Sequence, residues 1–331
     1  MAQREIPGLG VIGQNCESDL IDLRVGGDGY FRVGSDGVQR IVTPLDRKVE
    51  LIVYADRTLV YVKSAMGYPA IYPLSAPSFE APAQAVLMDL DGTSVHSEAF
   101  WVWIIQKSIA RLMGDENFTL EPADEPHVSG HSVSEHLQYC IDKYCPDKKV
   151  EKAREHYFEI TAHEMGQVLA GRGRADAFVP SPGLKEFLLK LKESNVRIGL
   201  VTSGLYEKAW PEIVAAFRTL DMGDPLDFYD AIISAGFAIR RGQVGTLGEL
   251  APKPHPWLYA ETARVGLGID PSRRGRVIGM EDSSAGVISI RLAGFAAIGV
   301  AGGNIASGGC RPFVNHFAEN LLESLPIILG K

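Results

Sequence analysis

The nine residues from Ala85 to Thr93 constrain the fold of this chain more than any other stretch. The first four are apolar and partly β-branched, which predicts a short strand buried on both faces, as in a parallel sheet. Two carboxylates, Asp89 and Asp91, end this strand and are followed by Gly-Thr. Ligands of open α/β sheets bind beyond the carboxyl ends of the strands. Because crowded charges are costly without partners, the pair predicts a cation or a chemical task at that edge.

The remainder of the chain predicts the surroundings of this strand. From residue 97 to about 171, apolar residues recur at spacings of three and four, which predicts helices alone. Beyond residue 180, strand and helix patterns alternate, which predicts a Rossmann-like, doubly wound α/β core with a parallel sheet. The helical segment is therefore an insertion, and we expect it to form an α-helical cap. We expect strands at 196–201, 231–234, 277–280 and 296–300, and helices at 181–194, 256–266, 284–292 and 315–324.

Residues 1–80 have a different character, with Gly-Asp turns and short β-rich runs. They predict a small β-rich extension, a meander of about four strands that includes 30–33, followed by a stiff proline-containing connection from residue 69. So small a unit cannot bury all its apolar residues, so we expect it to pack on the main body or on a second subunit. The predicted domains are the extension at 1–80, the core at 81–95 and 181–331, and the cap at 96–180.

The composition narrows the partners and the location. The net charge is −8, which gives no electrostatic footprint for nucleic acid or for an anionic membrane. The amino terminus has no apolar core of a signal peptide, and no run reaches the length of about 18 apolar residues that a membrane span needs. The four cysteines are sparse and form no Cys-x-x-Cys, which is typical of reduced thiols. We therefore expect a cytoplasmic protein that binds neither nucleic acid nor membrane.

Polar side chains end three of the predicted strands, and a lysine lies in a proline-rich loop between the last two: Asp89 and Asp91, Thr202 and Ser203, Glu281 and Asp282, and Lys253. Two of these carboxylates 4 Å apart would repel by about 4 kcal/mol at an effective dielectric of about 20. A hard divalent cation with oxygen ligands removes this repulsion, and Mg²⁺ fits best. The lysine and the threonine hydroxyl beside it would supply donors for the oxygens of a phosphoryl group.

Four segments of the chain (86–93, 201–203, 253–254 and 279–286) resemble, in order, the four motifs of the haloacid dehalogenase superfamily. The chain is most similar to the β-phosphoglucomutase-like phosphatase branch, in which a helical cap follows the first motif. The resemblance covers about residues 85–326 and leaves the extension unexplained. It implies a Mg²⁺-dependent phosphatase that hydrolyses a small phosphorylated metabolite, such as a sugar phosphate, through an aspartyl-phosphate.

The resemblance also implies a role for each matching residue. Asp89 would be the nucleophile, and Asp91 the general acid that later activates water. Thr202 and Lys253 would bind the transferring phosphoryl group. The implied substrate-binding residues are Ser203, Gly204 and, in the cap loop that selects the substrate, His131. The implied Mg²⁺ ligands are Asp89, the main-chain oxygen of Asp91, Glu281 and Asp282.

Three alternatives stay open at the level of sequence. A sugar-phosphate mutase uses the same four motifs and differs in its cap. A phosphonatase would need a cap lysine that forms a Schiff base, for which Lys107 and Lys143 are candidates. A catalytically silent binding protein would use the extension as its working part, although the intact set of Asp89, Asp91, Lys253 and Asp282 argues against it. The extension could also mediate a homo-oligomer.

Overall fold

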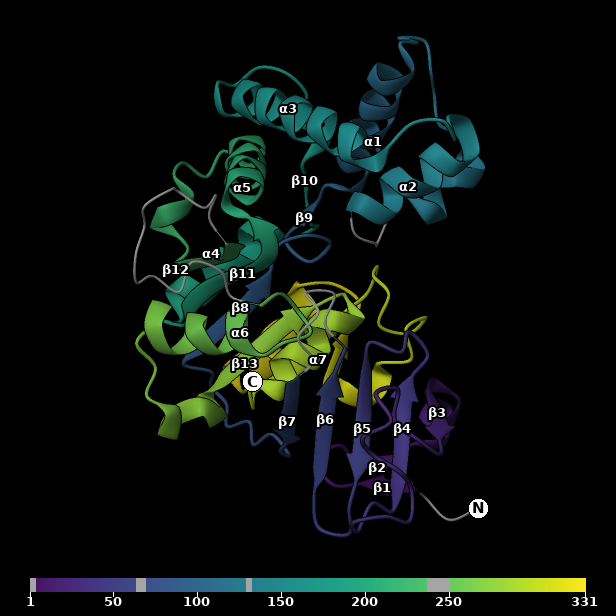
Figure 1. The fold of residues 1–331 in the computed structure, drawn as a ribbon. Coiled ribbons are helices and arrows are strands. Elements are labelled where there is room, and N and C mark those ends of the chain that lie inside the picture. Colours follow the sequence, from purple (N-terminus) through teal and green to yellow (C-terminus); the bar gives the residue numbers. More distant parts are fainter. Residues whose placement is uncertain (1–3, 64–69, 129–132, 237–250) are drawn as a thin grey trace, which may run out of the picture. The chain divides into compact units, whose positions relative to one another are not determined.

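The computed structural model describes residues 4–63, 70–128, 133–236 and 251–331, and the chain divides into two compact units. We call them the core unit, which comprises residues 1–94, 181–205 and 225–331, and the helical unit, which comprises 95–180 and 206–224. Figure 1 shows their elements. The core unit contains a parallel sheet with flanking helices and an antiparallel sheet formed by the amino-terminal residues. This confirms the predicted fold class.

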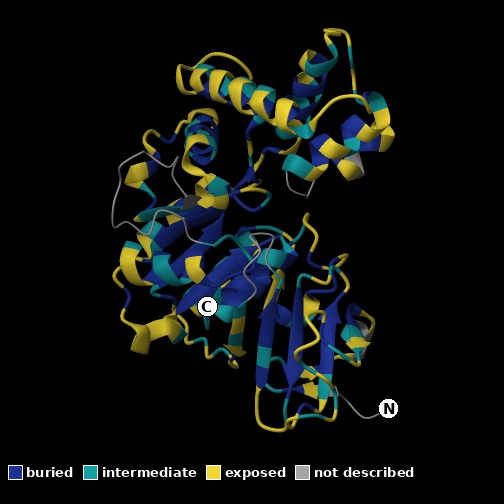
Figure 2. Ribbon diagram, in the orientation of Figure 1, coloured by how far each residue is buried: buried dark blue, intermediate teal, exposed yellow. Residues whose placement is uncertain are grey.

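The parallel sheet places the Asp89 strand at its centre. Its strand order is β12-β11-β8-β13-β14-β15. Every residue of β8, β13 and β14 is buried, as the apolar runs predict (Figure 2). In the register, Val201 lies opposite Asp89 and Met280 opposite Met88, so the polar residues at and just beyond these positions lie at one edge of the sheet. The strands are β8 (Ala85–Asp89), β11 (Arg197–Leu205), β12 (Ala231–Gly236), β13 (Val277–Glu281), β14 (Ala296–Val300) and β15 (His316–Ala318).

Helices α6 and α7 bury one apolar face of this sheet. Leu258 and Tyr259 of α6 and Ile290 of α7 pack with Leu87 and Val201 of the strands. Helix α4 contacts β11. The helices are α4 (Leu184–Glu193), α6 (Trp257–Glu261, continued by a π-helical turn over Thr262–Gly266), α7 (Ser284–Leu292) and α8 (Leu325–Leu329).

The helix predicted at 315–324 is wrong. Residues His316–Ala318 form β15, and only Leu322–Ser324 make a 3₁₀ turn before α8. Asn315 shows why, because its amide donates to the oxygen of Ala297 and its side chain accepts from the amide of Ala297, both at 2.9 Å. These two bonds start a parallel pairing with β14, and pairing to a neighbouring strand outweighs local helix preference.

The amino-terminal residues form a five-stranded antiparallel meander in the order β3-β4-β5-β6-β7, and β1 (Arg4–Ile6) pairs with β2 (Gly10–Ile12). The meander is confirmed, but residues 30–33 form no strand and Ala70–Leu74 form one despite Pro73. Strand β7 lies at the sheet edge, where a proline is tolerated because its missing N–H is not needed by an inner neighbour. The strands are β3 (Leu20–Leu23), β4 (Arg40–Pro44), β5 (Val49–Val53), β6 (Thr58–Val62) and β7 (Ala70–Leu74).

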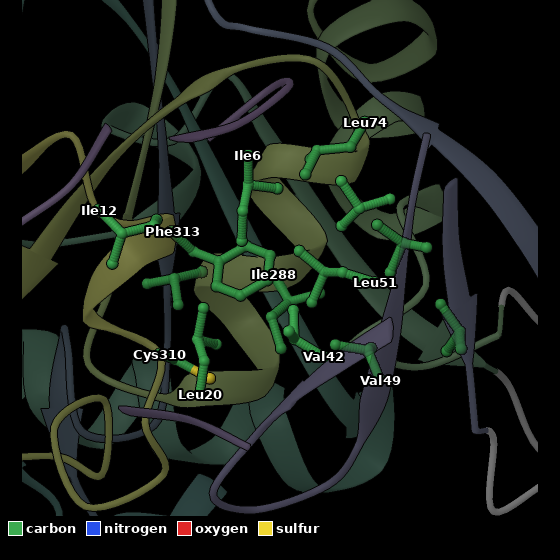
Figure 3. Close-up of a cluster of buried hydrophobic side chains, with 14 of the residues drawn as sticks. Ile6, Ile12, Leu20, Val42, Val49, Leu51, Leu74, Ile288, Cys310 and Phe313 are labelled. Carbon is green, nitrogen blue, oxygen red and sulfur yellow. The ribbon is translucent and has the colours of Figure 1, made fainter. Parts of the chain in front are cut away.

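The extension packs against α7 and the loop after β14 through one shared apolar cluster. In Figure 3, Ile288 of α7 and Phe313 lie among Leu51, Val42 and Ile6 of the extension. All five side chains are fully buried. Packing on the main body, the first of the two expectations for this extension, is therefore confirmed.

Among its described residues, the helical unit has four α-helices and a two-stranded ribbon of β9 (Val95–His96) and β10 (Val179–Pro180). Helix α5, which follows β11 in sequence, belongs to this unit. It is held there by Glu212, which accepts from Trp101 Nε1 at 2.9 Å, and by Lys208, whose ammonium lies 3.6 Å from the centre of the Trp101 ring. The helices are α1 (Glu98–Met113), α2 (Val133–Tyr144), α3 (Val150–Leu169) and α5 (Tyr206–Leu220).

Short 3₁₀ helices lie at Gln14–Asp19, Pro122–His127, Ala175–Ala177, Pro225–Asp227, Pro271–Arg276 and Arg311–Phe313. None of the helices in the described part of the chain has both the length and the apolar character needed to cross a bilayer.

Candidate active site

Three segments of the core unit meet at Lys253. Its ammonium donates to Asp89 Oδ1, at the end of β8, and to Glu281 Oε1, at the end of β13. The side chains of Lys253 and Asp89 are each only 7% exposed, and that of Glu281 is fully buried. Buried charges are stable only when paired and hydrogen-bonded, so these contacts fix the lysine beside Asp89.

Glu281 has both carboxylate oxygens occupied by protein donors. Oε1 accepts from Tyr259 Oη at 2.8 Å as well as from Lys253. Oε2 accepts from the hydroxyl of Ser283 at 2.8 Å and from its amide at 3.2 Å. So many donors fix the orientation of the carboxylate, and through it the position of the Lys253 ammonium.

Asp282 lies in a close-fitting backbone cradle. Thr93 Oγ1 donates to Asp282 Oδ1 at 3.1 Å. A Cβ atom on Gly92, whose φ is +83°, would lie 2.2 Å from Asp282 Oδ2, and one on Gly303 would lie 2.4 Å from the same oxygen. Only glycine fits at these two positions, and their backbones hold the Asp282 carboxylate in place.

The charges at the site are unbalanced without a cation. Asp89, Glu281 and Asp282 each offer a carboxylate oxygen, and these oxygens lie within 4.8 Å of one another. Burial, and then the neighbouring Glu281, raises the pKa of Asp89 well above its ordinary value and that of Asp282 to about 7. Burial alone would lower the pKa of Lys253, but the charges of Asp89 and Glu281 raise it, so the lysine stays protonated. With one ammonium and three carboxyl groups, the site has a formal excess of negative charge that a divalent cation with oxygen ligands would balance.

The remaining predicted residues of the core lie at the same sheet edge. Asp91 is exposed in the turn after β8, and its charge contributes to the raised pKa of Asp89. Thr202 is buried within β11, three residues before the strand ends, and its hydroxyl accepts from the amide of Gly204 at 2.9 Å. Ser203 is exposed, and its hydroxyl accepts from the amide of Lys253 at 3.1 Å, which joins two of the motif loops.

The cap residue His131 lies outside the described residues. In the helical unit, Lys143 donates to Asp124 at 2.7 Å and to Glu121 at 2.8 Å. The bond to Asp124 raises the pKa of Lys143. Lys107 lies over the ring of Trp103, 5.9 Å from its centre. Lys143 is therefore held as the ammonium and not in the neutral form that a Schiff base requires.

Sequence reasoning missed two side chains that hold the acidic residues, Tyr259 and Thr93. Tyr259 lies among apolar residues of α6, so the period predicts only a buried aromatic there. A buried tyrosine hydroxyl needs a partner, and that requirement was the available signal. Thr93 was part of the recognised first motif, but its partner Asp282 is 189 residues away in sequence, so spacing could not reveal the contact.

The fold and this geometry define an α/β protein with a buried acidic and lysine site at the carboxyl edge of its sheet. A family model of haloacid dehalogenase-like hydrolases matches residues 83–294. The chain therefore belongs to the haloacid dehalogenase-like hydrolase family, as its four motifs predict. Among curated proteins, no relative matches.

Solved structures share the fold at low identity. One is a predicted phosphoglycolate phosphatase from Haemophilus somnus, with a TM-score of 0.54, 15% identity, and coverage of 75% of this chain and 98% of that one. Another is a putative phosphatase from Clostridium difficile, with a TM-score of 0.53, 18% identity, and coverage of 76% and 100%. A mutant of CbbY from Rhodobacter sphaeroides, in complex with xylulose-(1,5)bisphosphate, has a TM-score of 0.50, 17% identity, and coverage of 73% and 96%. About a quarter of the chain lies outside each of these three alignments.

Proposed function

We propose that this protein is a Mg²⁺-dependent phosphatase that hydrolyses a small phosphorylated metabolite through an aspartyl-phosphate on Asp89. The observation that carries the proposal is the position of Lys253, whose ammonium contacts Asp89 and Glu281 beside the carboxylate of Asp282. A nucleophilic carboxylate, a fixed cation and an acidic pair with metal-ligand spacing are the parts that phosphoryl transfer requires.

Each residue has a defined task in this proposal. Asp89 attacks phosphorus as the ester bond to the leaving oxygen breaks, and Asp91 donates a proton to that oxygen. Asp91 then takes a proton from the water that attacks the aspartyl-phosphate, which releases inorganic phosphate and frees Asp89. Lys253 and the Thr202 hydroxyl donate to the phosphoryl oxygens, and Ser203 and Gly204 lie beside them for substrate binding.

The residues present fit Mg²⁺. Asp89, Asp282 and the main-chain oxygen of Asp91 would hold it, with Glu281 completing the coordination directly or through water. Because Lys253, Tyr259 and Ser283 already occupy the Glu281 oxygens, coordination through water is the better fit. The ion, when bound, supplies positive charge against the phosphoryl oxygens.

The neighbours support a phosphorylated substrate in general. The structures above include a predicted phosphoglycolate phosphatase and a protein in complex with a sugar bisphosphate. A phosphonatase is disfavoured because Lys143 is tied to Asp124 and stays charged. Four features of the protein stay predictions: the cytoplasmic location, a homo-oligomer through residues 1–80, the three-part domain division and the role of His131.

The proposal is tested with a panel of phosphorylated metabolites and p-nitrophenyl phosphate, with phosphate release measured after dialysis against EDTA and after addition of Mg²⁺. We expect release only with Mg²⁺, and preference for one group of small phosphate esters. A parallel assay for isomerised sugar phosphate distinguishes the mutase, in which phosphate is transferred and not released. Release at full rate without any divalent cation, or no turnover of any ester, would contradict the proposal.

A further inference from the structure

The extension reaches the loop that carries Lys253. Tyr72, on β7, shares a hydrogen bond of 2.8 Å with Nδ1 of His255, two residues after Lys253. His255 is 4% exposed, and burial lowers its pKa, so the ring is neutral. Ser289 of α7 donates to the main-chain oxygen of His255 at 2.6 Å. The residue that follows the Lys253–Pro254 pair is thus held from the extension on one side and from α7 on the other.

A second contact from the extension reaches the loops around Asp282. Asp46, in the turn between β4 and β5, accepts from the hydroxyl of Ser284 at 2.6 Å. The amide of Asp46 donates to the oxygen of Gly308 at 3.1 Å. Ser284 is two residues beyond Asp282 in sequence, and Gly308 closes the loop in which Gly303 presses against the Asp282 carboxylate.

The same loop is tied back to Ser284. The amide of Ser284 donates to the side-chain oxygen of Asn304 at 2.7 Å, next to Gly303. Asp46, Ser284 and Asn304 therefore form a short chain of bonds that runs from the extension to the backbone cradle of Asp282.

Buried packing and hydrogen bonds between the extension and α7 support both contacts. The apolar cluster of Figure 3 joins the extension to α7, the helix that starts just after Asp282. Arg291 of α7, 2% exposed, donates to the main-chain oxygen of Gly8 at 2.6 Å and to that of Phe313 at 3.2 Å. Close-packed groups of this kind transmit small displacements. Loss of the contact at Tyr72 or Asp46 should therefore displace the loop that the residue contacts.

We propose that the extension is a positioning element of the active site, with Tyr72 holding the loop of Lys253 and Asp46 holding the loops around Asp282. The kinetic tests of this positioning role rest on the proposed function. Loss of the Tyr72 contact and loss of the Asp46 contact should differ in effect, because Lys253 acts on the phosphoryl group whereas Asp282 acts on the metal. Neither Tyr72 nor Asp46 is a catalytic residue in this proposal.

The test uses the full-length chain with Tyr72→Phe and Asp46→Ala. Tyr72→Phe keeps the ring that packs against Trp257 and removes only the hydroxyl. We expect it to lower kcat for p-nitrophenyl phosphate by about tenfold, with the Mg²⁺ concentration for half-maximal activity unchanged. Asp46→Ala should raise that Mg²⁺ concentration by about tenfold and leave kcat at saturating Mg²⁺ nearly unchanged. Asp46→Asn, which retains an acceptor oxygen for Ser284, should restore most of the Mg²⁺ affinity.

Thr43→Val is the matched control. Thr43 is buried in β4, and its hydroxyl donates to the oxygen of Val49 at 2.7 Å, within the extension. This variant should lower Tm and change neither kinetic constant. The proposal is overturned if all three variants change kcat and the half-maximal Mg²⁺ concentration together. The extension would then act only on stability.

A readout without substrate or metal separates this proposal from the proposed function. In the metal-free protein, hydrogen–deuterium exchange should rise at residues 253–258 in Tyr72→Phe and at residues 282–286 in Asp46→Ala, each without a rise at the other segment. Unchanged exchange at both segments would overturn the positioning role even if the enzyme is a phosphatase. The expected exchange pattern in a protein that hydrolyses no phosphate ester would overturn the proposed function alone.

Discussion

At Asp89, burial and charge oppose the ionised form that a nucleophile needs. The residue is buried and lies near Glu281 and Asp282, so its pKa is raised even though Lys253 contacts it. A divalent cation would shift the balance toward the anion. A bound cation would therefore favour the ionised form in which the proposed nucleophile acts.

Asp89→Asn removes this nucleophile and one of the crowded carboxylates. We expect turnover of p-nitrophenyl phosphate to fall below detection, by at least about 10³-fold. Because the change relieves repulsion and Lys253 keeps Glu281 as partner, we expect Tm of the metal-free protein to be unchanged or higher. Kinetics with differential scanning calorimetry measures both. Retained activity would remove Asp89 as the nucleophile.

The pH dependence of stability follows from the raised pKa values. In the window from about 4, the ordinary Asp value, to about 7, the value for Asp282, the folded metal-free protein binds more protons than the unfolded chain. The contribution of this group to the free energy of unfolding is therefore largest at the acid end of the window and falls as the pH rises.

Calorimetry across that window measures the slope. Wild type should lose stability relative to Asp282→Asn as the pH rises, and Mg²⁺ should raise the Tm of wild type more above the window than within it. Equal slopes for wild type and Asp282→Asn would show that Asp282 has no raised pKa.

Residue-level prediction from sequence succeeded where strand ends decide position. Asp89, Lys253 and Asp282 were predicted to meet because parallel strands present their carboxyl ends at one sheet edge, and the structure brings them together. The contacts of Tyr72 with His255 and of Asp46 with Ser284 join residues 183 and 238 positions apart. No local pattern encodes such distant pairs, so they had to be observed.

At the scale of elements, the turn after β8 is as important as the strand itself. Gly92 turns the chain with φ +83°, and its missing side chain lets Asp282 approach. The turn thereby brings the end of β8 against the end of β13, two elements that are remote in sequence.

Gly92→Ala tests this approach. The added methyl would meet Asp282 Oδ2 and displace it, so we expect Mg²⁺-dependent activity to fall by about 10²-fold or more. Gly268→Ala is the control, since Gly268 also has a positive φ, +61°, but its Cβ would meet nothing within 4 Å. Both should lose about 1–2 kcal/mol of stability from backbone strain. Equal activity of the two variants would contradict the cradle.

Strands were predicted correctly where the apolar pattern alone identifies them. The prediction failed where pairing with a neighbouring strand determines the secondary structure. The run at 296–300 is β14 as predicted, because a strand buried on both faces needs only a short continuous apolar run. Residues 315–324 have a pattern that also suits a helix, and the bonds between Asn315 and Ala297 favour the strand β15. The strand at Ala70–Leu74 was missed because Pro73 argues against a strand unless the strand lies at an edge.

At the scale of the whole molecule, the extension shares one apolar cluster with α7 and the loop after β14, and α7 in turn packs on the parallel sheet through Ile290. Asp19 of the extension also accepts two bonds from Arg311, at 2.6 and 2.7 Å, beside this cluster. A shared core of this kind predicts that the two sheets unfold together.

Leu51→Ala tests that prediction. Leu51 is fully buried in the shared cluster, so its truncation should lower the free energy of unfolding by about 2–5 kcal/mol. Ile71→Ala, at a side chain that is 45% exposed on the edge strand, should cost less than about 1 kcal/mol. Hydrogen–deuterium exchange in β8 and β13, measured across a urea titration, reports the unfolding transition of the parallel sheet. If Leu51→Ala leaves that transition unchanged, the extension folds independently.

The central claim, that Asp89 accepts the phosphoryl group, is tested most directly by trapping it with Asp91→Asn. The p-nitrophenolate leaving group needs little protonation, so the first step still proceeds, while the loss of the base slows attack by water. Mass spectrometry of the acid-quenched protein, after mixing with p-nitrophenyl phosphate and Mg²⁺, should find one phosphoryl group on the peptide that contains Asp89 and none when Asp89 is also Asn. Phosphorylation of another residue, or turnover of the ester by wild type while no phosphorylated peptide appears in Asp91→Asn, would contradict the account.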